Sequence, residues 1–220
     1  MIVTIDGPAG AGKSTIARAL ARRLGFRFLD TGAMYRAVAW SARENHLDWD
    51  DPQQIVALAR QLRLEVGEHE VRVDGRDVTE AIRTSEVTAL THFAANNPGV
   101  REHLVELQRQ AAGMDSIVTE GRDQGTVVFP HAECKIYLTA SPEERARRRA
   151  HELASRGQAT TLAEVLHHQN QRDERDANRE VGPMVAASDA LEVSTDGLTP
   201  TQVLDRLEEI VRAKLTQRST

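Results

Sequence analysis

The stretch that decides the fold is Met1-Ile2-Val3-Thr4-Ile5-Asp6-Gly7-Pro8-Ala9-Gly10-Ala11-Gly12-Lys13-Ser14-Thr15. Its first six residues are typical of a short buried strand, and the next eight fit the pattern G-x-x-x-x-G-K-[ST] at every fixed position. Apolar residues at helical spacing follow at once, which supplies the strand, loop and helix context that the motif requires. The N–H groups of such a loop can point at phosphate oxygens, and the helix N-terminus adds partial positive charge. The sequence therefore predicts a phosphate-binding loop.

Within this loop the motif gives two residues separate tasks. We expect Lys13 to reach the β- and γ-phosphates of ATP and the Ser14 hydroxyl to bind Mg²⁺ directly. The expected ATP-binding residues are Gly7, Pro8, Ala9, Gly10, Ala11, Gly12, Lys13, Ser14 and Thr15. The competing interpretation is a glycine-rich turn without a ligand, but such a turn does not require a Lys-Ser pair at its end.

Composition limits the class of protein and its surroundings. The chain has 220 residues, enough for one domain with a sizeable core, and its net charge of -5 argues against nucleic acid as a partner. The single cysteine, Cys134, lies in an apolar run and is typical of a core residue in a reducing compartment. The sequence has no signal-peptide pattern and no apolar run of the ~20 residues that a membrane helix requires. We expect a soluble cytoplasmic protein that contacts no membrane.

Apolar strands alternate with amphipathic helices along the chain. This order predicts an α/β fold of the P-loop NTPase type, a three-layer sandwich in which helices cover a parallel sheet. The expected strands span residues 1–6, 26–29, 116–119, 135–139 and 190–194. Alternation of apolar and polar residues over 62–78 differs from the rest and predicts a small β-rich insertion of half-exposed antiparallel strands.

Several helices are expected from their capping residues and periodicity. Thr31 is predicted to cap a helix that carries Tyr35 and Arg36 in its first turn. Further helices are expected over 51–62, 80–91, 100–112 and 161–171. Ser141-Pro142-Glu143-Glu144 and Thr199-Pro200-Thr201-Gln202 each predict a helix that opens with a capping box and a proline.

Charged side chains gather where ligands bind in parallel sheets. Glu120-Gly121-Arg122-Asp123 stands at the carboxyl end of a predicted strand, which makes it a site candidate by position. A second anionic substrate requires its own cations, and the chain offers Arg36, Arg101, Arg122, Arg172 and Arg179. Each alone is more often a solvated surface arginine. Together with the phosphate loop they favour a kinase of small molecules over a switch-type NTPase.

Four motifs in order give a more specific resemblance. They are Gly7 to Thr15, Asp30-Thr31-Gly32-Ala33-Met34-Tyr35-Arg36, Gly121-Arg122-Asp123-Gln124-Gly125-Thr126-Val127-Val128-Phe129-Pro130, and Arg172-Asp173-Glu174-Arg175-Asp176-Ala177-Asn178-Arg179. The chain resembles the bacterial cytidylate kinases over essentially its whole length, including the β-rich insertion. The resemblance implies one kinase domain with a core of 1–30, 113–145 and 185–220. It places the nucleoside-monophosphate-binding region at 31–112 and a short mobile lid at about 146–180.

The resemblance also implies an activity and the residues that perform it. The activity is ATP-dependent phosphorylation of CMP and dCMP by direct in-line transfer, with Mg²⁺ as cofactor and a monomer as the expected state. Thr31, Arg36 and Arg122 would hold the acceptor phosphate, while Arg101 and Asp123 would read cytosine. Arg172 and Asp176 would hold the ribose or the transferring phosphates, and Arg179 would contact the γ-phosphoryl group from the lid. The implied CMP site also includes Tyr35 and His92, and the implied catalytic residues are Lys13, Arg122, Arg172 and Arg179.

Two positions depart from the family pattern. His92, with Thr91 beside it, falls where the family places a small hydroxyl residue against the base. Glu120 stands where the family more often has Asp, and it either holds Mg²⁺ through water or is a plain strand-end carboxylate. Asp123 likewise has a second interpretation, in which it pairs with Arg122 or Arg101 and only orients that arginine.

Other functions remain as alternatives at this stage. One is a P-loop kinase of another acceptor, either UMP or a metabolite such as shikimate or gluconate. A metabolite kinase would not require the β-rich insertion. Another is a non-catalytic nucleotide sensor, which would not require two arginine-bearing segments beyond the phosphate loop. A panel of acceptors in one assay separates these functions.

Overall fold

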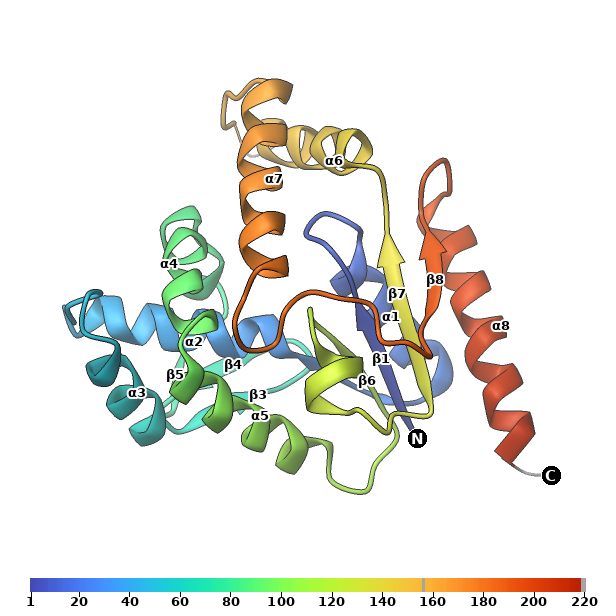
Figure 1. The fold of residues 1–220 in the computed structure, drawn as a ribbon, viewed down its shortest axis with the longest axis horizontal. Coiled ribbons are helices and arrows are strands. Elements are labelled where there is room, and N and C mark those ends of the chain that lie inside the picture. Colours follow the sequence, from blue (N-terminus) through green and yellow to red (C-terminus); the bar gives the residue numbers. More distant parts are fainter. Residues whose placement is uncertain (156, 219–220) are drawn as a thin grey trace. The chain divides into compact units, whose positions relative to one another are not determined.

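The computed structural model describes residues 1–155 and 157–218 (Figure 1). It contains two compact units, Met1–Phe26 with Ser116–Thr220, and Arg27–Asp115. Arg156, which belongs to the predicted lid, lies outside the described residues. No helix in the described part of the chain has the length and apolar character needed to cross a membrane.

The first unit is built on parallel strands. They are β1 (Ile2–Asp6), β6 (Ile117–Glu120), β7 (Cys134–Thr139) and β8 (Leu191–Ser194), in the order β6-β1-β7-β8 (Figure 1). Ile5 of β1 stands beside Glu120 of β6 in the parallel register, so the carboxyl ends of both strands reach the same edge of the sheet. The predicted parallel α/β core is confirmed.

Helix α1 (Lys13–Leu24) connects the phosphate loop to the rest of this unit. It begins after Gly12 and ends at Gly25, and both glycines adopt the left-handed conformation that side chains disfavour. Its apolar face is buried, and the helix packs against β6 and α8 (Pro200–Arg218). The start of α8 has the predicted capping box, because Thr199 and Gln202 exchange hydrogen bonds between side chain and backbone.

Two further helices of this unit, α6 (Pro142–Ser155) and α7 (Leu162–Ala177), pack against each other. Helix α7 starts with a capping box of Thr161 and Glu164, and it extends six residues beyond the predicted end at residue 171. Only one of the two hydrogen bonds of the capping box predicted at Ser141 is present. The Ser141 hydroxyl accepts the Glu144 N–H, but the Ser141 N–H donates to Asp196.

The second unit combines helices with a small antiparallel sheet. The helices are α2 (Thr31–Glu44), α3 (Pro52–Gln61), α4 (Ser85–Ala95) and α5 (Pro98–Ala112), and a short strand β2 (Arg27–Asp30) precedes them. The sheet contains β3 (Leu64–Val66), β4 (Val71–Val73) and β5 (Arg76–Asp77) in that order. Antiparallel strands are therefore present where the alternating pattern over 62–78 predicts them.

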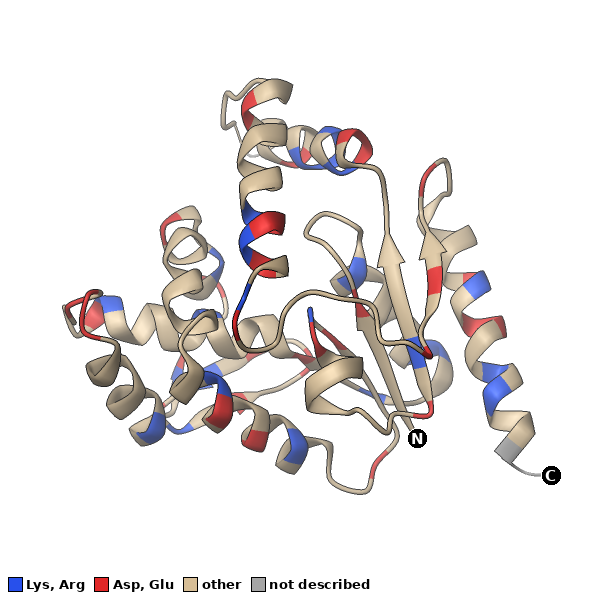
Figure 2. Cartoon of the chain, viewed as in Figure 1, with Lys and Arg blue, Asp and Glu red and all other residues tan. Residues whose placement is uncertain are grey.

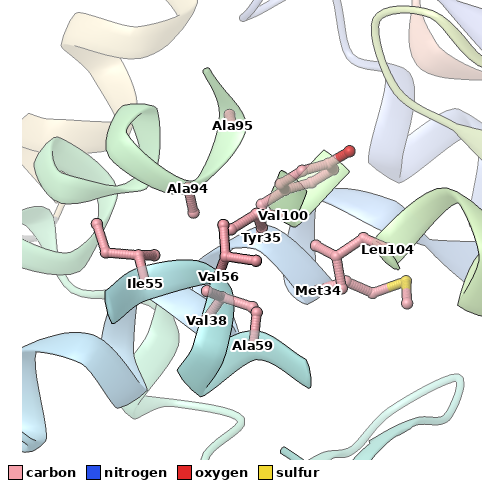
Figure 3. Packing of buried hydrophobic residues seen from close by; sticks show 10 residues of the cluster. All are labelled: Met34, Tyr35, Val38, Ile55, Val56, Ala59, Ala94, Ala95, Val100 and Leu104. Carbon is pink, nitrogen blue, oxygen red and sulfur yellow. The ribbon is translucent and has the colours of Figure 1, made fainter. Parts of the chain in front are cut away.

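Buried side chains from the four helices form one hydrophobic cluster of this unit (Figure 3). Its members are Met34, Tyr35, Val38, Ile55, Val56, Ala59, Ala94, Ala95, Val100 and Leu104. Because these residues come from helices distant in sequence, the cluster holds α2, α3, α4 and α5 together. This packing supports the residues of α2, α4 and α5 for which the sequence predicts a role in binding.

Two helix starts in this unit differ from the predictions. Asp30 caps α2, because its carboxylate accepts the Ala33 N–H at 2.8 Å, and Thr31 is the first residue inside the helix. The single helix predicted over 80–91 is broken. A 3₁₀ turn (Ala81–Arg83) ends at Thr84, whose extended backbone and hydroxyl then start α4.

Candidate active site

The phosphate loop turns tightly at its first glycine. Gly7 has φ of +137°, and a Cβ built there would lie 2.1 Å from the Leu138 carbonyl oxygen of β7. Only glycine satisfies both conditions, because a side chain would meet rigid backbone. The loop then leads to Gly12 (φ +89°) and into α1 at Lys13.

Lys13 lies inside the loop that it completes. Its side chain is buried, and Nζ donates a hydrogen bond to the Pro8 carbonyl oxygen at 2.8 Å. Burial, together with the positive charges of Arg122 and Arg172, lowers the pKa of Lys13 from 10.5 to about 7. An anion bound at the loop would favour the protonated ammonium, because opposite charges stabilise the charged form.

The hydroxyl of Ser14 lies beside the carboxylate of Glu120. Ser14 Oγ donates to Glu120 Oε1 at 2.8 Å, and the carboxylate itself is buried at the end of β6. These are hard oxygen donors, which Mg²⁺ prefers, and they suit an ion that completes its shell with substrate phosphates and water. Within residues 1–155 and 157–218 no group of three or more His, Cys, Asp or Glu could hold a metal ion alone. The Ser14 hydroxyl and the Glu120 carboxylate fit a magnesium ion that is bound together with a nucleotide.

Asp6 anchors the segment that follows Arg122 and Asp123. Its two carboxylate oxygens accept the N–H groups of Gln124 at 2.8 Å and Gly125 at 2.7 Å. Burial raises the pKa of Asp6 to about 6, although these hydrogen bonds favour the carboxylate. The anchored segment forms a π-helical turn (Gln124–Val128), a geometry often found at functional sites. The sequence predicts neither this turn nor the role of Asp6; the only local signal is an acid that ends an apolar strand.

Arg122, Asp176 and Arg179 form a charged cluster in the first unit, in which Asp176 is buried and both arginines are partly buried. Arg122 Nε donates to Asp176 Oδ2 at 2.9 Å, and Arg179 donates to the other oxygen of the same carboxylate. Burial opposes ionisation of Asp176, but Arg122, Arg179 and Arg172 hold the pKa of Asp176 below its usual value. The two arginines are thus fixed by one carboxylate. Asp123, next to Arg122, is buried at the start of the π-helical turn.

Two residues outside the predicted site hold the phosphate loop from α6 and α7. Arg145 Nη1 donates to the Ala9 carbonyl oxygen at 3.0 Å and also pairs with Asp173. Asp173 Oδ1 accepts the Ala9 N–H at 3.4 Å. Apart from Glu164 near its start, the charged residues of α7 lie in the half that ends at Ala177 (Figure 2). The sequence does not predict the contacts of Arg145 and Asp173 with Ala9, because they join residues more than a hundred positions apart.

In the second unit, the Asp30 carboxylate forms ion pairs with two arginines at the start of α2. Its carboxylate oxygens lie 3.2 Å from Arg36 Nη2 and 3.4 Å from Arg83 Nη2. The Nε atom of Arg36 is buried and has no hydrogen-bond partner among the described residues. A Cβ at Gly32 would lie 3.0 Å from Arg36 Nη1, so this glycine leaves room for the guanidinium. Tyr35 and Arg36 are the fifth and sixth residues of α2, so they lie one turn later than the sequence predicts. Arg83, which is not among the predicted site residues, joins Arg36 at Asp30.

The other predicted residues of this unit lie on α2, α4 and α5. The Arg101 guanidinium carbon lies 5.5 Å from the Tyr35 ring centroid, and Arg101 Nη1 donates to the Ala95 carbonyl at 3.1 Å. His92 stacks on Phe93 with ring centroids 4.1 Å apart. His92 Nδ1 lies 2.7 Å from the Ala89 carbonyl oxygen, which can only accept, so Nδ1 carries a proton.

Each unit thus gathers its own part of the predicted residues. The first brings together Lys13, Ser14, Glu120, Arg122, Asp123, Arg172, Asp176 and Arg179 around two strand ends, α1 and α7. The second contains Thr31, Tyr35, Arg36, His92 and Arg101. Thr31 is buried in the first turn of α2, where helix N–H groups suit an anion.

A parallel sheet, a glycine loop at the end of β1 and a Lys-Ser pair opening α1 define a P-loop NTPase fold. The sequence model of the family described as cytidylate kinase matches residues 3–213. The chain belongs to the cytidylate kinase family.

Individual relatives support this membership. A cytidylate kinase of Rhodopirellula baltica is 51% identical over 212 residues, which cover 96% of this chain and 93% of the relative. A cytidylate kinase of Desulfitobacterium hafniense is 48% identical, with 97% of this chain and 93% of the relative covered. A crystal structure of an uncharacterized protein from Eubacterium ventriosum shares the fold, with a TM-score of 0.53, 10% identity, and 97% and 98% of the two chains covered.

Proposed function

We propose that the protein transfers the γ-phosphoryl group of ATP to CMP and dCMP, which gives CDP and dCDP. The observation that carries this proposal is the buried Lys13 at the phosphate loop, beside the Ser14–Glu120 pair, in a chain of the cytidylate kinase family. Kinases of metabolites such as shikimate and non-catalytic nucleotide sensors are not favoured by this membership.

The donor nucleotide would bind through the loop residues 7–15. Lys13 would turn from the Pro8 carbonyl to the β- and γ-phosphates and neutralise charge that develops between them. Ser14 would hold Mg²⁺ directly and Glu120 would hold it through water. The ion, when bound, supplies positive charge at the phosphates.

The acceptor-binding residues are proposed from the membership in the cytidylate kinase family. Thr31, Arg36 and Arg122 would hold the CMP phosphate. The buried Nε of Arg36, which finds no partner in the described part of the chain, suits such an anion. Arg101 and Asp123 would contact cytosine, with Tyr35 and His92 lining the same site. This assignment makes residues 31–112 the acceptor-binding region.

Catalysis would consist of alignment, charge neutralisation and exclusion of water. Arg172 and Asp176 would position the ribose or the transferring phosphates, and Arg179 would meet the γ-phosphoryl group when the lid, about 146–180, closes. Phosphoryl transfer needs little covalent help from the protein, so no general base is assigned. We further propose that the enzyme acts in the cytoplasm as a monomer.

A coupled assay of ADP release tests the function, with CMP, dCMP, UMP, AMP and shikimate offered separately. We expect turnover with CMP and dCMP, a clearly lower rate with UMP and the lowest rates with AMP and shikimate. Lys13→Ala is the matched inactive control, because it removes the ammonium and leaves the glycine loop. Faster turnover of UMP or shikimate than of CMP would refute the proposed acceptor, and ATP binding without any turnover would indicate a sensor.

A further inference from the structure

Asp173 holds a backbone group of the phosphate loop that a nucleotide would need. Its Oδ1 accepts the Ala9 N–H at 3.4 Å, and the same carboxylate pairs with Arg145. Loop N–H groups of this kind are ligands for phosphate oxygens. The Asp173 carboxylate resembles a phosphate in two respects. Its oxygen accepts a hydrogen bond from the loop, and it carries negative charge.

Arg145 completes the contact from the other side of Ala9. Its Nη1 donates to the Ala9 carbonyl oxygen at 3.0 Å, and its Nε donates to the Ala140 carbonyl oxygen at 3.0 Å. The side chain is only 5% exposed. A buried guanidinium needs an anionic partner, so Arg145 must find another anion whenever Asp173 leaves.

The same helix connects this contact to the charged cluster. Asp173 and Asp176 are one turn apart on α7, and Asp176 holds Arg122 and Arg179. Gln169, one turn earlier, donates to the Pro142 carbonyl oxygen at the start of α6. A displacement of Asp173 from the loop therefore shifts the helix that carries residues proposed to meet the substrates.

We propose that Asp173 is a positioning residue that substitutes for a donor phosphate at the free loop and is displaced by that phosphate. The nucleotide then takes the Ala9 N–H and becomes the new partner of Arg145, while Asp173 gives up its contact with the loop. Occupancy of the loop and the position of α7 are thereby coupled. This inference rests on the proposed function, since it assumes that the loop binds the phosphates of ATP.

The test compares nucleotide affinities of Asp173→Asn and Asp173→Ala with those of the unchanged chain. We expect both variants to bind MgATP and MgADP more tightly, by about fivefold or more, a change typical of coupling between two sites. A residue that merely shapes the loop would give weaker binding. Glu174→Gln is the matched control, because it removes the same charge from an exposed position of α7 and should leave the affinities unchanged.

Calorimetric titration without an acceptor gives these affinities, and thermal unfolding reports whether each variant is folded. Equal or weaker nucleotide binding by folded Asp173→Asn would overturn the proposal. A second measurement uses the unchanged chain, so it does not depend on the variants folding. On addition of MgADP, amide hydrogen exchange of residues 172–178 must change as Asp173 gives up its contact with the loop, and unchanged exchange there would also overturn the proposal. If the unchanged chain itself binds no ATP, the proposed function fails instead.

Discussion

The buried Lys13 makes nucleotide binding depend on pH. Burial, Arg122 and Arg172 lower the pKa of Lys13 to about 7, so part of the free protein holds this side chain neutral near neutral pH. Bound phosphates restore the ammonium, because opposite charges favour the charged form. Binding of MgATP must therefore take up a proton whenever Lys13 starts out neutral.

The magnitude follows from the titration curve of one group. With a pKa of about 7, uptake on binding should be ~0.1 proton at pH 6, ~0.5 at pH 7 and close to 1 at pH 8.5. The affinity for MgATP should fall about fiftyfold between pH 7 and pH 9, since only the protonated fraction binds well. The stability of the free protein changes in the opposite direction. Between pH 7 and 10.5 the unfolded chain holds more protons at this lysine, so the Lys13 contribution to the free energy of unfolding rises with pH.

Calorimetry in buffers of different ionisation enthalpy measures the number of protons taken up. Above pH 7 the nucleotide phosphates are already ionised, since their relevant pKa is about 6. Lys13→Met provides the control: it should show no such uptake from pH 7 to 8.5, and its kcat should fall about a hundredfold or more. Proton uptake that stays the same from pH 7 to 8.5, or that persists in Lys13→Met over this range, would refute this account of Lys13.

Three further outcomes are expected. Arg179→Ala should lower kcat far more than it weakens CMP binding, because the contact of Arg179 forms mainly in the transition state. Calorimetry measures the CMP affinity and steady-state rates give kcat. Lost CMP affinity with unchanged kcat would contradict this expectation. Asp123→Asn should lower kcat/KM for CMP and reduce the ratio of kcat/KM for CMP to that for UMP. The reason is that an amide can donate to the uracil carbonyl, whereas a carboxylate can only accept. Proportional losses with both nucleotides would mean that Asp123 only orients an arginine. Leu104→Ala should reduce the free energy of unfolding, measured by urea denaturation, by about 2–5 kcal/mol. The reason is that this fully buried side chain belongs to the hydrophobic cluster of the second unit. A change below ~1 kcal/mol would mean that the cluster collapses around the gap.

Features set by neighbouring residues could be predicted from the sequence. The loop from Gly7 to Ser14 is one example, because its glycines, lysine and serine lie within eight positions of each other. The capping box at Thr199 is another, since both partners lie in one turn. Asp30 and Thr31 are adjacent and both can cap a helix, so the pattern locates the start of α2 within one residue without identifying the cap.

Features that depend on distant residues could not be predicted. Asp196 takes the Ser141 N–H from 55 positions away and prevents the full capping box. Asp6 holds the π-helical turn from 118 positions away, and no local pattern indicates that turn. The roles of Arg122, Asp123 and the other proposed site residues stay predictions, because they concern ligands rather than the folded chain.

The position of Asp6 has a consequence for engineering of this scaffold. This residue ends β1 immediately before Gly7, and its carboxylate also fixes the backbone of Gln124 and Gly125. A graft that exchanges segment 121–129 with that of another kinase would lose the hydrogen bonds to this carboxylate unless position 6 of the recipient is also aspartate. Donor segment and recipient strand must therefore be transplanted as a matched pair, and libraries that vary 121–129 should keep position 6 constant.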